Sequence, residues 1–213
     1  MFEKLSDRAV NQSFERQDQS QLNPRQIALA EIIKQYREHP QTLVLLRDRA
    51  EQDPDEKVRE FLVQQLASGW KDDPNTLPWL KNRIQSERSP EVVKALVQAL
   101  ARGWKDDLAT LNWFKTYSQY SQNPIVRAAA VQALARGWKN EFNVFEILCK
   151  CVFGDPFEPH DDVGVNPRQA ALEVIVEQYR DSHQTREILE DRAEKDPDQQ
   201  VREFAKEKLK QFA

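Results

Sequence analysis

The nine-residue string VQALARGWK occurs at residues 97–105 and again at residues 131–139, 34 positions later. The tripeptide Gly-Trp-Lys follows the same step, with its tryptophan at Trp70, Trp104 and Trp138. A period of this length is typical of repeat proteins, in which each repeat covers the apolar face of its neighbour. The sequence therefore predicts an array of stacked structural repeats.

The apolar residues within one period predict that each repeat consists of two helices. They form two runs with spacings of three and four residues, such as Val58, Leu62 and Leu66 in the first run and Leu77 and Leu80 in the second. These spacings place the apolar side chains on one side of an α-helix. Only five of the 213 residues are glycine, too few for the many turns of an all-β protein. We therefore expect an all-α fold, an α–α superhelix of about six helical hairpins.

Seven pairs of a polar residue followed by proline predict helix starts, because the polar side chain can cap the helix and proline suits its first turn. These pairs are Asn23-Pro24, Asp53-Pro54, Asp73-Pro74, Ser89-Pro90, Asn123-Pro124, Asn166-Pro167 and Asp196-Pro197. Together with the apolar spacing they predict helices at 2–10, 24–37, 41–52, 54–70, 74–87, 90–104, 107–121, 124–139, 142–153, 167–180, 184–194 and 197–212.

A longer repeat of 143 residues confirms this reading of the chain. Residues 23–61 align without a gap on residues 166–204, and an extended loop precedes each copy, at 11–22 and at 154–165. We interpret 1–213 as a single solenoid domain. Because the first and last predicted helices each lack a hairpin partner, we expect this domain to be a segment of a longer array.

The strings DPDEKVREFLVQQLASGW and RSPEVVKALVQALARGW resemble HEAT repeats, helical hairpins that stack into a right-handed superhelix. The twice-repeated phrase that begins NPRQ and ends VREF is more narrowly similar to the carboxy-terminal HEAT arrays that follow NACHT-type NTPase modules in cyanobacterial proteins. The resemblance implies a non-enzymatic HEAT-like solenoid that senses or docks a protein partner on its concave face.

The resemblance also implies a ladder in which an arginine of each concave helix bonds to an acidic residue in a neighbouring turn. Arg59, Arg127 and Arg202 match the arginine of this pattern, whereas Val93 stands at the equivalent place of the repeat between the first two. We therefore expect the ladder to be interrupted at Val93.

Charge and sequence motifs argue against several classes of protein. The net charge of −4 gives no general attraction to nucleic acids or anionic membranes. No apolar run approaches the 18 residues or more of a membrane span, and MFEKLSDRAV lacks the apolar core of a secretory leader. The phosphate-binding pattern GxxxxGK[ST] is absent. We expect a cytoplasmic protein, with any NTPase activity on another module of a longer chain.

Candidate catalytic groups are few. His39, His160 and His183 are the only histidines, and none belongs to a catalytic pattern. Cys149 and Cys151 follow the apolar rhythm of a helix, so we interpret them as small core side chains. The sequence therefore predicts no enzyme, no catalytic residue and no cofactor.

A metal site is the main alternative for the loop before residue 166, where His160, Asp161 and Asp162 lie close in sequence to the two cysteines. The equivalent loop of the other copy contains neither histidine nor cysteine. We therefore expect no metal ion, and we interpret Phe157 as the packing anchor of this loop.

The five tryptophans could stack on bases or on a bilin, but their common register favours a structural role at each interface between repeats. Tyr36 and Tyr179 replace tryptophan in the two repeats that begin NPRQ. This replacement suggests a requirement for aromatic size rather than for ligand recognition.

A polar and basic face remains as the candidate binding surface. Residues four apart share one face of a helix, and stacking the predicted helices would bring such faces together. The predicted partner-binding residues are Lys71, Lys94, Gln98, Arg102, Lys105, Gln132, Arg136 and Lys139. Their excess of positive charge suits an acidic protein segment or a partner that bears phosphate.

Two other functions are weighed against a docking array. Some helical-repeat proteins of photosynthetic bacteria attach or detach phycobilins, so a bilin lyase-like subunit of phycobiliprotein maturation is the alternative. DNA binding is disfavoured by the acidic composition and by the lack of a catalytic carboxylate in a basic cleft.

Overall fold

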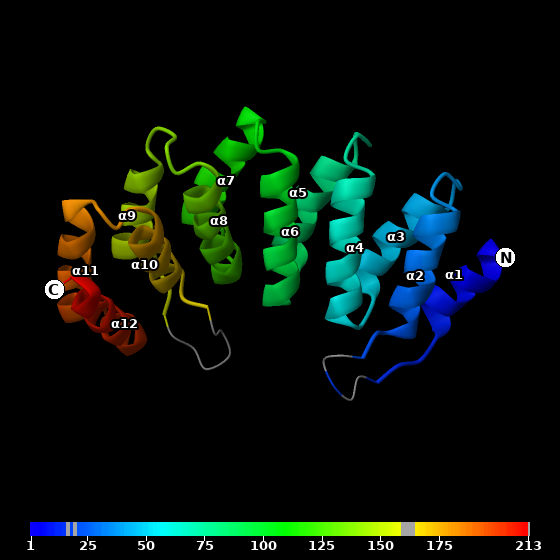
Figure 1. Ribbon diagram of the computed structural model, residues 1–213, viewed down its shortest axis with the longest axis horizontal. Helices are drawn as coiled ribbons and strands as arrows, with labels where there is room; N and C mark the ends of the chain where they lie inside the picture. Colours follow the sequence, from blue (N-terminus) through cyan, green and yellow to red (C-terminus); the bar gives the residue numbers. More distant parts are fainter. Residues whose placement is uncertain (16–17, 19–20, 159–164, 213) are drawn as a thin grey trace. The chain divides into compact units, whose positions relative to one another are not determined.

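The computed structural model describes residues 1–15, 18, 21–158 and 165–212. Within these ranges every regular element is helical, with twelve α-helices and one short 3₁₀ helix (Figure 1). The helices form successive hairpins, so the predicted all-α fold of an α–α solenoid is confirmed. The chain divides into two compact units, Met1–Gly103 (unit 1) and Trp104–Ala213 (unit 2).

Unit 1 contains two layers of helices. The helices α2, α4 and α6 are neighbours in one layer, and α1, α3 and α5 pack against them (Figure 1). Their bounds are α1 Phe2–Asn11, α2 Pro24–Gln35, α3 Thr42–Gln52, α4 Glu56–Gly69, α5 Thr76–Ser86 and α6 Pro90–Gly103.

Unit 2 repeats this arrangement. The helices α8, α10 and α12 are neighbours in one layer, α7 and α9 pack beside each other and against α8, and α11 packs against α10 and α12. Their bounds are α7 Leu108–Tyr120, α8 Pro124–Gly137, α9 Val144–Gly154, α10 Pro167–Gln178, α11 His183–Lys195 and α12 Gln199–Leu209, followed by the 3₁₀ helix Lys210–Phe212.

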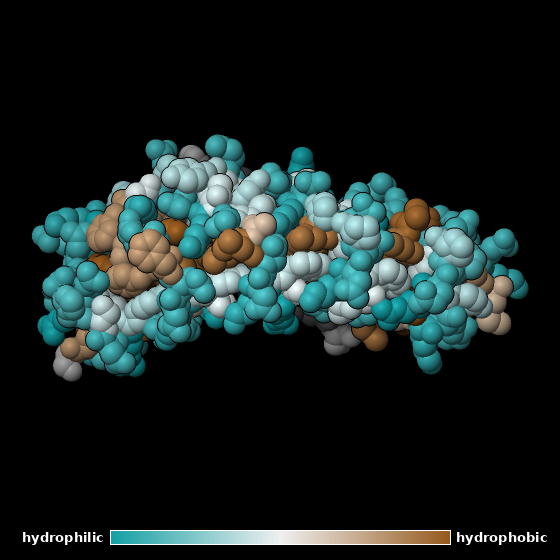
Figure 2. Space-filling model, turned by 90° about the horizontal axis from the view of Figure 1, so that it is seen from above, coloured by the Kyte–Doolittle hydropathy of each residue, from teal (hydrophilic) through white to brown (hydrophobic). Residues whose placement is uncertain are grey.

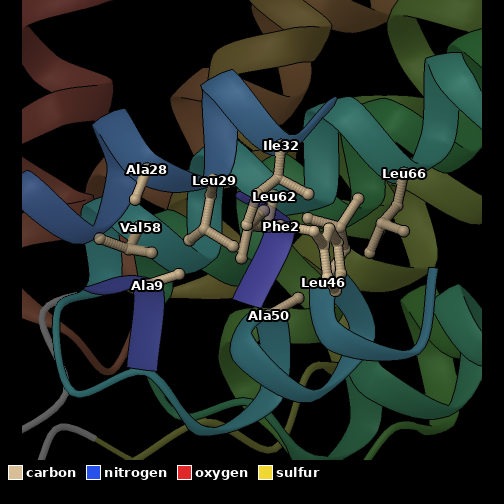
Figure 3. Packing of buried hydrophobic residues seen from close by; sticks show 10 residues of the cluster. All are labelled: Phe2, Ala9, Ala28, Leu29, Ile32, Leu46, Ala50, Val58, Leu62 and Leu66. Atoms are coloured by element: carbon tan, nitrogen blue, oxygen red, sulfur yellow. The ribbon is translucent and has the colours of Figure 1, made fainter. Parts of the chain in front are cut away.

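The buried side chains of unit 1 come from both layers. Figure 3 shows Leu29 and Ile32 of α2 pointing toward Leu62 of α4, with Leu46 of α3 beside them and Phe2 of α1 among them. All five side chains are buried. Full burial of one such side chain stabilises the fold by about 1.5–3 kcal/mol, so the stripe of apolar residues holds each helix in its place in the unit.

Each predicted helix coincides with an observed one, and most boundaries agree within two residues. The prediction is wrong at three of the seven proline-marked starts. The N-caps of α4 and α12 are Asp55 and Asp198, and α5 begins after Asn75, in each case two residues beyond the predicted cap. The reason is that Asp53, like its equivalent Asp196, accepts bonds from an arginine of another helix and from the backbone N–H two residues later, which leaves the cap to the next aspartate.

The helices α2, α4, α6, α8 and α10 each end in Gly or Gln, and an aromatic residue follows. Four of these aromatic residues share one backbone conformation. Tyr36, Trp70, Trp138 and Tyr179 are the C-cap residues of α2, α4, α8 and α10, with φ between −126° and −137° in the last three and −130° in Tyr36. Trp104 follows α6 in the same way. The predicted equivalence of the tryptophans and the two tyrosines is thus visible in the backbone.

In unit 2 the polar tips of these aromatic side chains connect successive turns. The Trp138 indole Nε1 donates to the carbonyl oxygen of Lys105 at 3.1 Å, and the Tyr179 hydroxyl donates to the carbonyl oxygen of Lys139 at 2.8 Å. Both acceptors are the lysine of a Gly-Trp-Lys tripeptide one repeat earlier. The repeated tripeptide therefore acts as a structural link between neighbouring hairpins.

Candidate functional site

The eight predicted binding residues lie on α6 and α8 or in the turns that follow α4, α6 and α8, four in each unit. Lys71, Lys94, Gln98 and Arg102 belong to unit 1, and Lys105, Gln132, Arg136 and Lys139 belong to unit 2. The six cationic side chains are exposed and the two glutamines are half-buried. The helical register thus leaves all six charges accessible to a partner.

In unit 1 the predicted face follows one side of α6. Lys94, Gln98 and Arg102 are four residues apart, so their side chains lie one above the other. Lys94 and Arg102 make no ion pair or hydrogen bond within the described part of the chain. Their charges are therefore available for a carboxylate or phosphate of another molecule.

In unit 2 two of the predicted cations already have neighbours on α10. The Arg136 guanidinium lies 3.7 Å from the carboxylate of Glu177, and both side chains are about half exposed. The ammonium group of Lys139 donates to the carbonyl oxygen of Gln178 at 3.2 Å, at the carboxyl end of α10. Lys139 therefore also caps a helix, since cations are favoured at this end of the helix dipole.

The same face becomes acidic beyond α8, which the sequence reasoning missed. Glu177 on α10 has the register of Arg102 and Arg136, and Glu203 on α12 has the register of Lys94. Glu173 and Glu207 have the register of Gln98 and Gln132. The signal was present, because Glu177 follows Arg136 by 41 residues, one period lengthened by the seven extra residues of the extended loop. The prediction considered only the helices in strict 34-residue register.

An open pocket of about 620 Å³ lies among three of the predicted cations in unit 2. Lys105 belongs to the turn before α7, whereas Arg136 and Lys139 lie at the end of α8 and in the turn that follows. Leu111 and Trp138 supply its apolar lining. The structure thus brings three of the eight predicted residues, all in unit 2, around a concavity, whereas Gln132 does not line it.

A ladder of buried arginine–carboxylate pairs joins neighbouring hairpins, as the resemblance implied. Arg59 lies 3.1 Å from Glu87, and Arg127 lies 2.6 Å from Asp155, with every side chain in these pairs at least 86% buried. Val93, at the equivalent place on α6, is fully buried. The arginine–carboxylate ladder is therefore interrupted at a residue that belongs to the apolar core.

Two further rungs were missed by the sequence reasoning. Arg25 pairs with Asp53 at 2.8 Å, and Arg168 pairs with Asp196 at 3.2 Å. Arg25 lies 34 residues before Arg59, so the period itself could have identified this rung. The prediction looked only for arginine after valine and overlooked arginine after proline.

Each ladder arginine also binds a carbonyl oxygen of the turn before its own helix. Arg59 Nη1 donates to Asp53 at 2.7 Å, Arg127 Nη1 to Ser121 at 2.7 Å, and Arg202 Nη1 to Asp196 at 2.6 Å. Arg202 makes no ion pair with a carboxylate in the described ranges, so its predicted bond to an acidic side chain is not observed. A buried guanidinium that satisfies several acceptors in two turns fixes their separation. The ladder is therefore part of the scaffold rather than of an accessible site.

The ladder shifts the ionisation of its members. Burial of Glu87 favours its neutral form, but the backbone N–H of Ser89 and the guanidinium groups of Arg59 and Arg83 outweigh this effect and lower the pKa of the carboxyl group. The hydrogen bond to Asp53 raises the pKa of Arg25. Both ion pairs thus remain charged at neutral pH.

The candidate chemical groups are placed as follows. His39 stacks on Phe2 with ring centroids 4.0 Å apart, and His183 is exposed at the start of α11. His160, Asp161 and Asp162 lie outside the described residues. In the described ranges no group of three or more histidine, cysteine or acidic side chains is arranged to hold a metal ion.

The cysteines are packed in α9. Cys151 is buried and Cys149 is half-buried, and both are free thiols. Burial raises the pKa of Cys151 to about 12, and burial together with Glu146 raises the pKa of Cys149. Both therefore remain protonated thiols at neutral pH, which agrees with core packing. Phe157 is buried as well, as expected for the anchor of its loop.

Among the helices that the structure describes, none has both the length and the apolar character needed to cross a membrane.

Comparison with known families finds a similarity to HEAT repeats over part of the chain. A family model described as HEAT repeats matches residues 43–135, a stretch that runs from α3 into α8 and contains the first copy of the nonapeptide and the first five residues of the second. Comparisons with curated proteins and with solved structures found no match. HEAT repeats generally mediate protein–protein interaction and are typically non-enzymatic scaffolds.

Proposed function

We propose that this chain is a non-enzymatic docking array that binds an acidic segment of a protein partner through the exposed basic residues of each unit. The HEAT-repeat match supports protein–protein interaction as the general role. The narrower proposal rests on one observation: Lys94, Arg102 and Lys105 are exposed cations without a partner in the described part of a chain whose net charge is −4.

The residues proposed to bind the partner differ in how freely they can do so. Lys94, Arg102 and Lys105 need no rearrangement, because their side chains are not engaged elsewhere in the described ranges. Arg136 must exchange Glu177 for the partner, which costs little because an exposed ion pair contributes only about 0–1 kcal/mol. Lys71 and Lys139 already have interactions within their own unit and supply background charge. Gln98 and Gln132 can add neutral hydrogen bonds.

The partner would be held chiefly by charge, so its binding should depend strongly on ionic strength. Pairs between exposed charges are screened over about 8 Å at physiological salt. Protein partners with dense carboxylates or phosphates share the chemistry that this face recognises. The resemblance of the NPRQ phrase further supports the proposal that the array is the docking part of a longer cytoplasmic protein with an NTPase module.

Charge reversal tests the proposal. The triple variant Lys94→Glu, Arg102→Glu and Lys105→Glu should lower the affinity for a fluorescein-labelled, glutamate-rich peptide at least tenfold without lowering the melting temperature. A control variant carries Lys4→Glu, Lys206→Glu and Lys210→Glu, which makes the same change in net charge at exposed residues elsewhere. Adding Arg136→Glu and Lys139→Glu should reduce the affinity further.

Two results would contradict the proposal. Equal loss of affinity in the triple variant and in its control would show that net charge alone matters. Stable visible colour after mixing the protein with a phycobilin would instead favour the lyase-like alternative, since a docking array has no chromophore site.

A further inference from the structure

The pocket in unit 2 has an apolar floor that is held rigidly. Trp138 is 6% exposed, and its ring lies 5.4 Å from the fully buried ring of Phe114. Its indole Nε1 is bonded to the carbonyl of Lys105, and Leu111 beside it is buried. A preformed floor of this kind can accept an apolar side chain without reorganisation.

Bulky apolar residues are exposed at this edge of unit 2. Leu108, which lines the pocket, is 69% exposed, and Phe142, which follows the lining residue Glu141, is 82% exposed. Figure 1 shows the turns before α7 and α9 at the upper edge, and Figure 2, seen from that side, shows brown apolar surface among teal polar surface. In unit 1 the same register holds Pro40 and Pro74. The exposed leucine and phenylalanine are therefore not a requirement of the repeat.

The charges around the pocket favour an apolar anchor with acidic neighbours. Of the three carboxylates in the lining, Asp107 is committed to capping α7, where it accepts from the N–H of Thr110 at 3.0 Å. Asp106 and Glu141 balance part of the positive charge, so the pocket itself suits an uncharged side chain. Lys105 and Arg136 on its border are positioned to pair with carboxylates beside that side chain.

We propose that this pocket receives one bulky apolar side chain of the partner segment, such as leucine or phenylalanine, while acidic residues next to it pair with Lys105 and Arg136. This inference deepens the proposed function and rests on it. It specifies the partner as an extended acidic segment with a single apolar anchor, rather than any polyanion.

Gly137 offers a direct way to fill the pocket. It lines the pocket at the last residue of α8, and a Cβ atom added there would meet no atom within 4 Å. Gly103 has the same register at the end of α6, equally open space and no place in this pocket. Gly137→Leu and Gly103→Leu are therefore a matched test and control, and replacing helical glycine favours the fold.

The experiment compares two labelled peptides that share their glutamates and differ in one central residue, phenylalanine or alanine. The wild-type protein should bind the phenylalanine peptide about tenfold more tightly, as expected for burial of one aromatic side chain. Gly137→Leu should abolish this preference while binding the alanine peptide as before, and Gly103→Leu should keep it. Leu108→Ser, at an exposed position, should reduce the preference and serves if Gly137→Leu misfolds.

The outcomes separate this inference from the proposed function. The pocket proposal would be wrong if the wild-type protein bound both peptides with equal affinity. It would also be wrong if Gly137→Leu and Leu108→Ser kept the preference for the phenylalanine peptide. Neither result would contradict the binding of acidic segments by the basic residues. If neither peptide bound the wild-type protein, the pocket proposal and the proposed function would both be wrong. Tighter binding of a lysine-flanked phenylalanine peptide would also refute the inference, because the neighbours of the anchor would then be basic.

Discussion

Arg25 in unit 1 and Arg168 in unit 2 occupy equivalent positions of the 143-residue repeat, yet their guanidinium groups meet the facing aspartate differently. Arg25 makes two parallel bonds to Asp53, from Nε and Nη2, each of 2.8 Å. Arg168 reaches both oxygens of Asp196 from Nε alone, at 3.2 and 3.3 Å. Its Nη2 is buried without a hydrogen-bond partner in the described part of the chain.

A second arginine near Asp196 accompanies this difference. Arg192 approaches Asp196 at 3.5 Å, and its guanidinium lies 4.7 Å from the centre of the Phe153 ring. The equivalent Arg49 pairs with Asp48, as Arg192 does with Asp191, but it makes no ion pair with Asp53 in the described ranges. The residue equivalent to Phe153 is Val10. Sharing does not by itself prevent parallel bonds, because Glu87 also pairs with Arg83 and yet accepts from Nε and Nη2 of Arg59 at 3.2 and 3.1 Å. Identical phrases in a repeat can therefore form different contacts when a neighbouring helix changes one side chain.

Removing the shared carboxylate should have the largest effect. Asp53→Ala should destabilise unit 1 by about 3–5 kcal/mol, because it leaves the buried charge of Arg25 without its carboxylate partner. Asp196→Ala should cost unit 2 at least as much, because Arg168 loses its carboxylate partner and Arg192 loses one of its two. Hydrogen exchange measured by mass spectrometry would localise each loss. If either variant accelerated amide hydrogen exchange equally in unit 1 and in unit 2, the two ion pairs would not stabilise their own units separately, and the comparison of Arg25 with Arg168 would fail.

Glu87 in unit 1 resembles Asp196, because Arg59 and Arg83 share it. Glu87→Gln should lower the free energy of unfolding by about 2 kcal/mol at pH 7, the range for hydrogen bonds to charged groups. The lowered pKa of Glu87 means that the wild-type advantage is complete above the ordinary value of 4.5 and is lost as the pH falls through the lower folded-state value. Urea titrations from pH 7 to pH 3 should show the two proteins converging.

The second arginine can be tested directly. Arg192→Met should destabilise unit 2 by about 1–2 kcal/mol, since it removes a pair to a buried carboxylate. Arg49→Met should cost about 1 kcal/mol or less, because Asp48 is 41% exposed and such pairs contribute little. Thermal melts of the two variants would compare these losses, and a larger loss for Arg49→Met would contradict the proposed sharing of Asp196.

Phe153→Val, which introduces the residue found in the other copy, should have the smallest effect. The loss should be about 0.5–1 kcal/mol, the contribution of a cation–π contact at a partly exposed site. The informative measurement is a crystal structure of the variant, in which Arg168 should adopt the parallel bonds of Arg25. If the hydrogen bonds between Arg168 and Asp196 were unchanged in the variant, Phe153 would not determine their geometry.

The candidate site was predictable in part. Helical register sufficed to show that Lys94 and Arg102 share an exposed face, because a spacing of four residues determines which side chains lie together. It did not reveal that Arg136 meets Glu177 or that Lys139 caps α10, because these contacts join helices separated by the extended loop. The pocket beside Trp138 was also out of reach, since concavity depends on how turns pack.

The sequence by itself determined the helices, their order and the face that each one buries, because these follow from local spacing and from the repetition of apolar residues. Only the tertiary structure decided which aspartate caps a helix and which serves an arginine. Asp53 and Asp55 are alike in the local sequence, but Arg25 approaches only the first, so the cap passes to the second. A local pattern can specify a helix, whereas the partner of a buried charge is chosen by whatever the fold brings next to it.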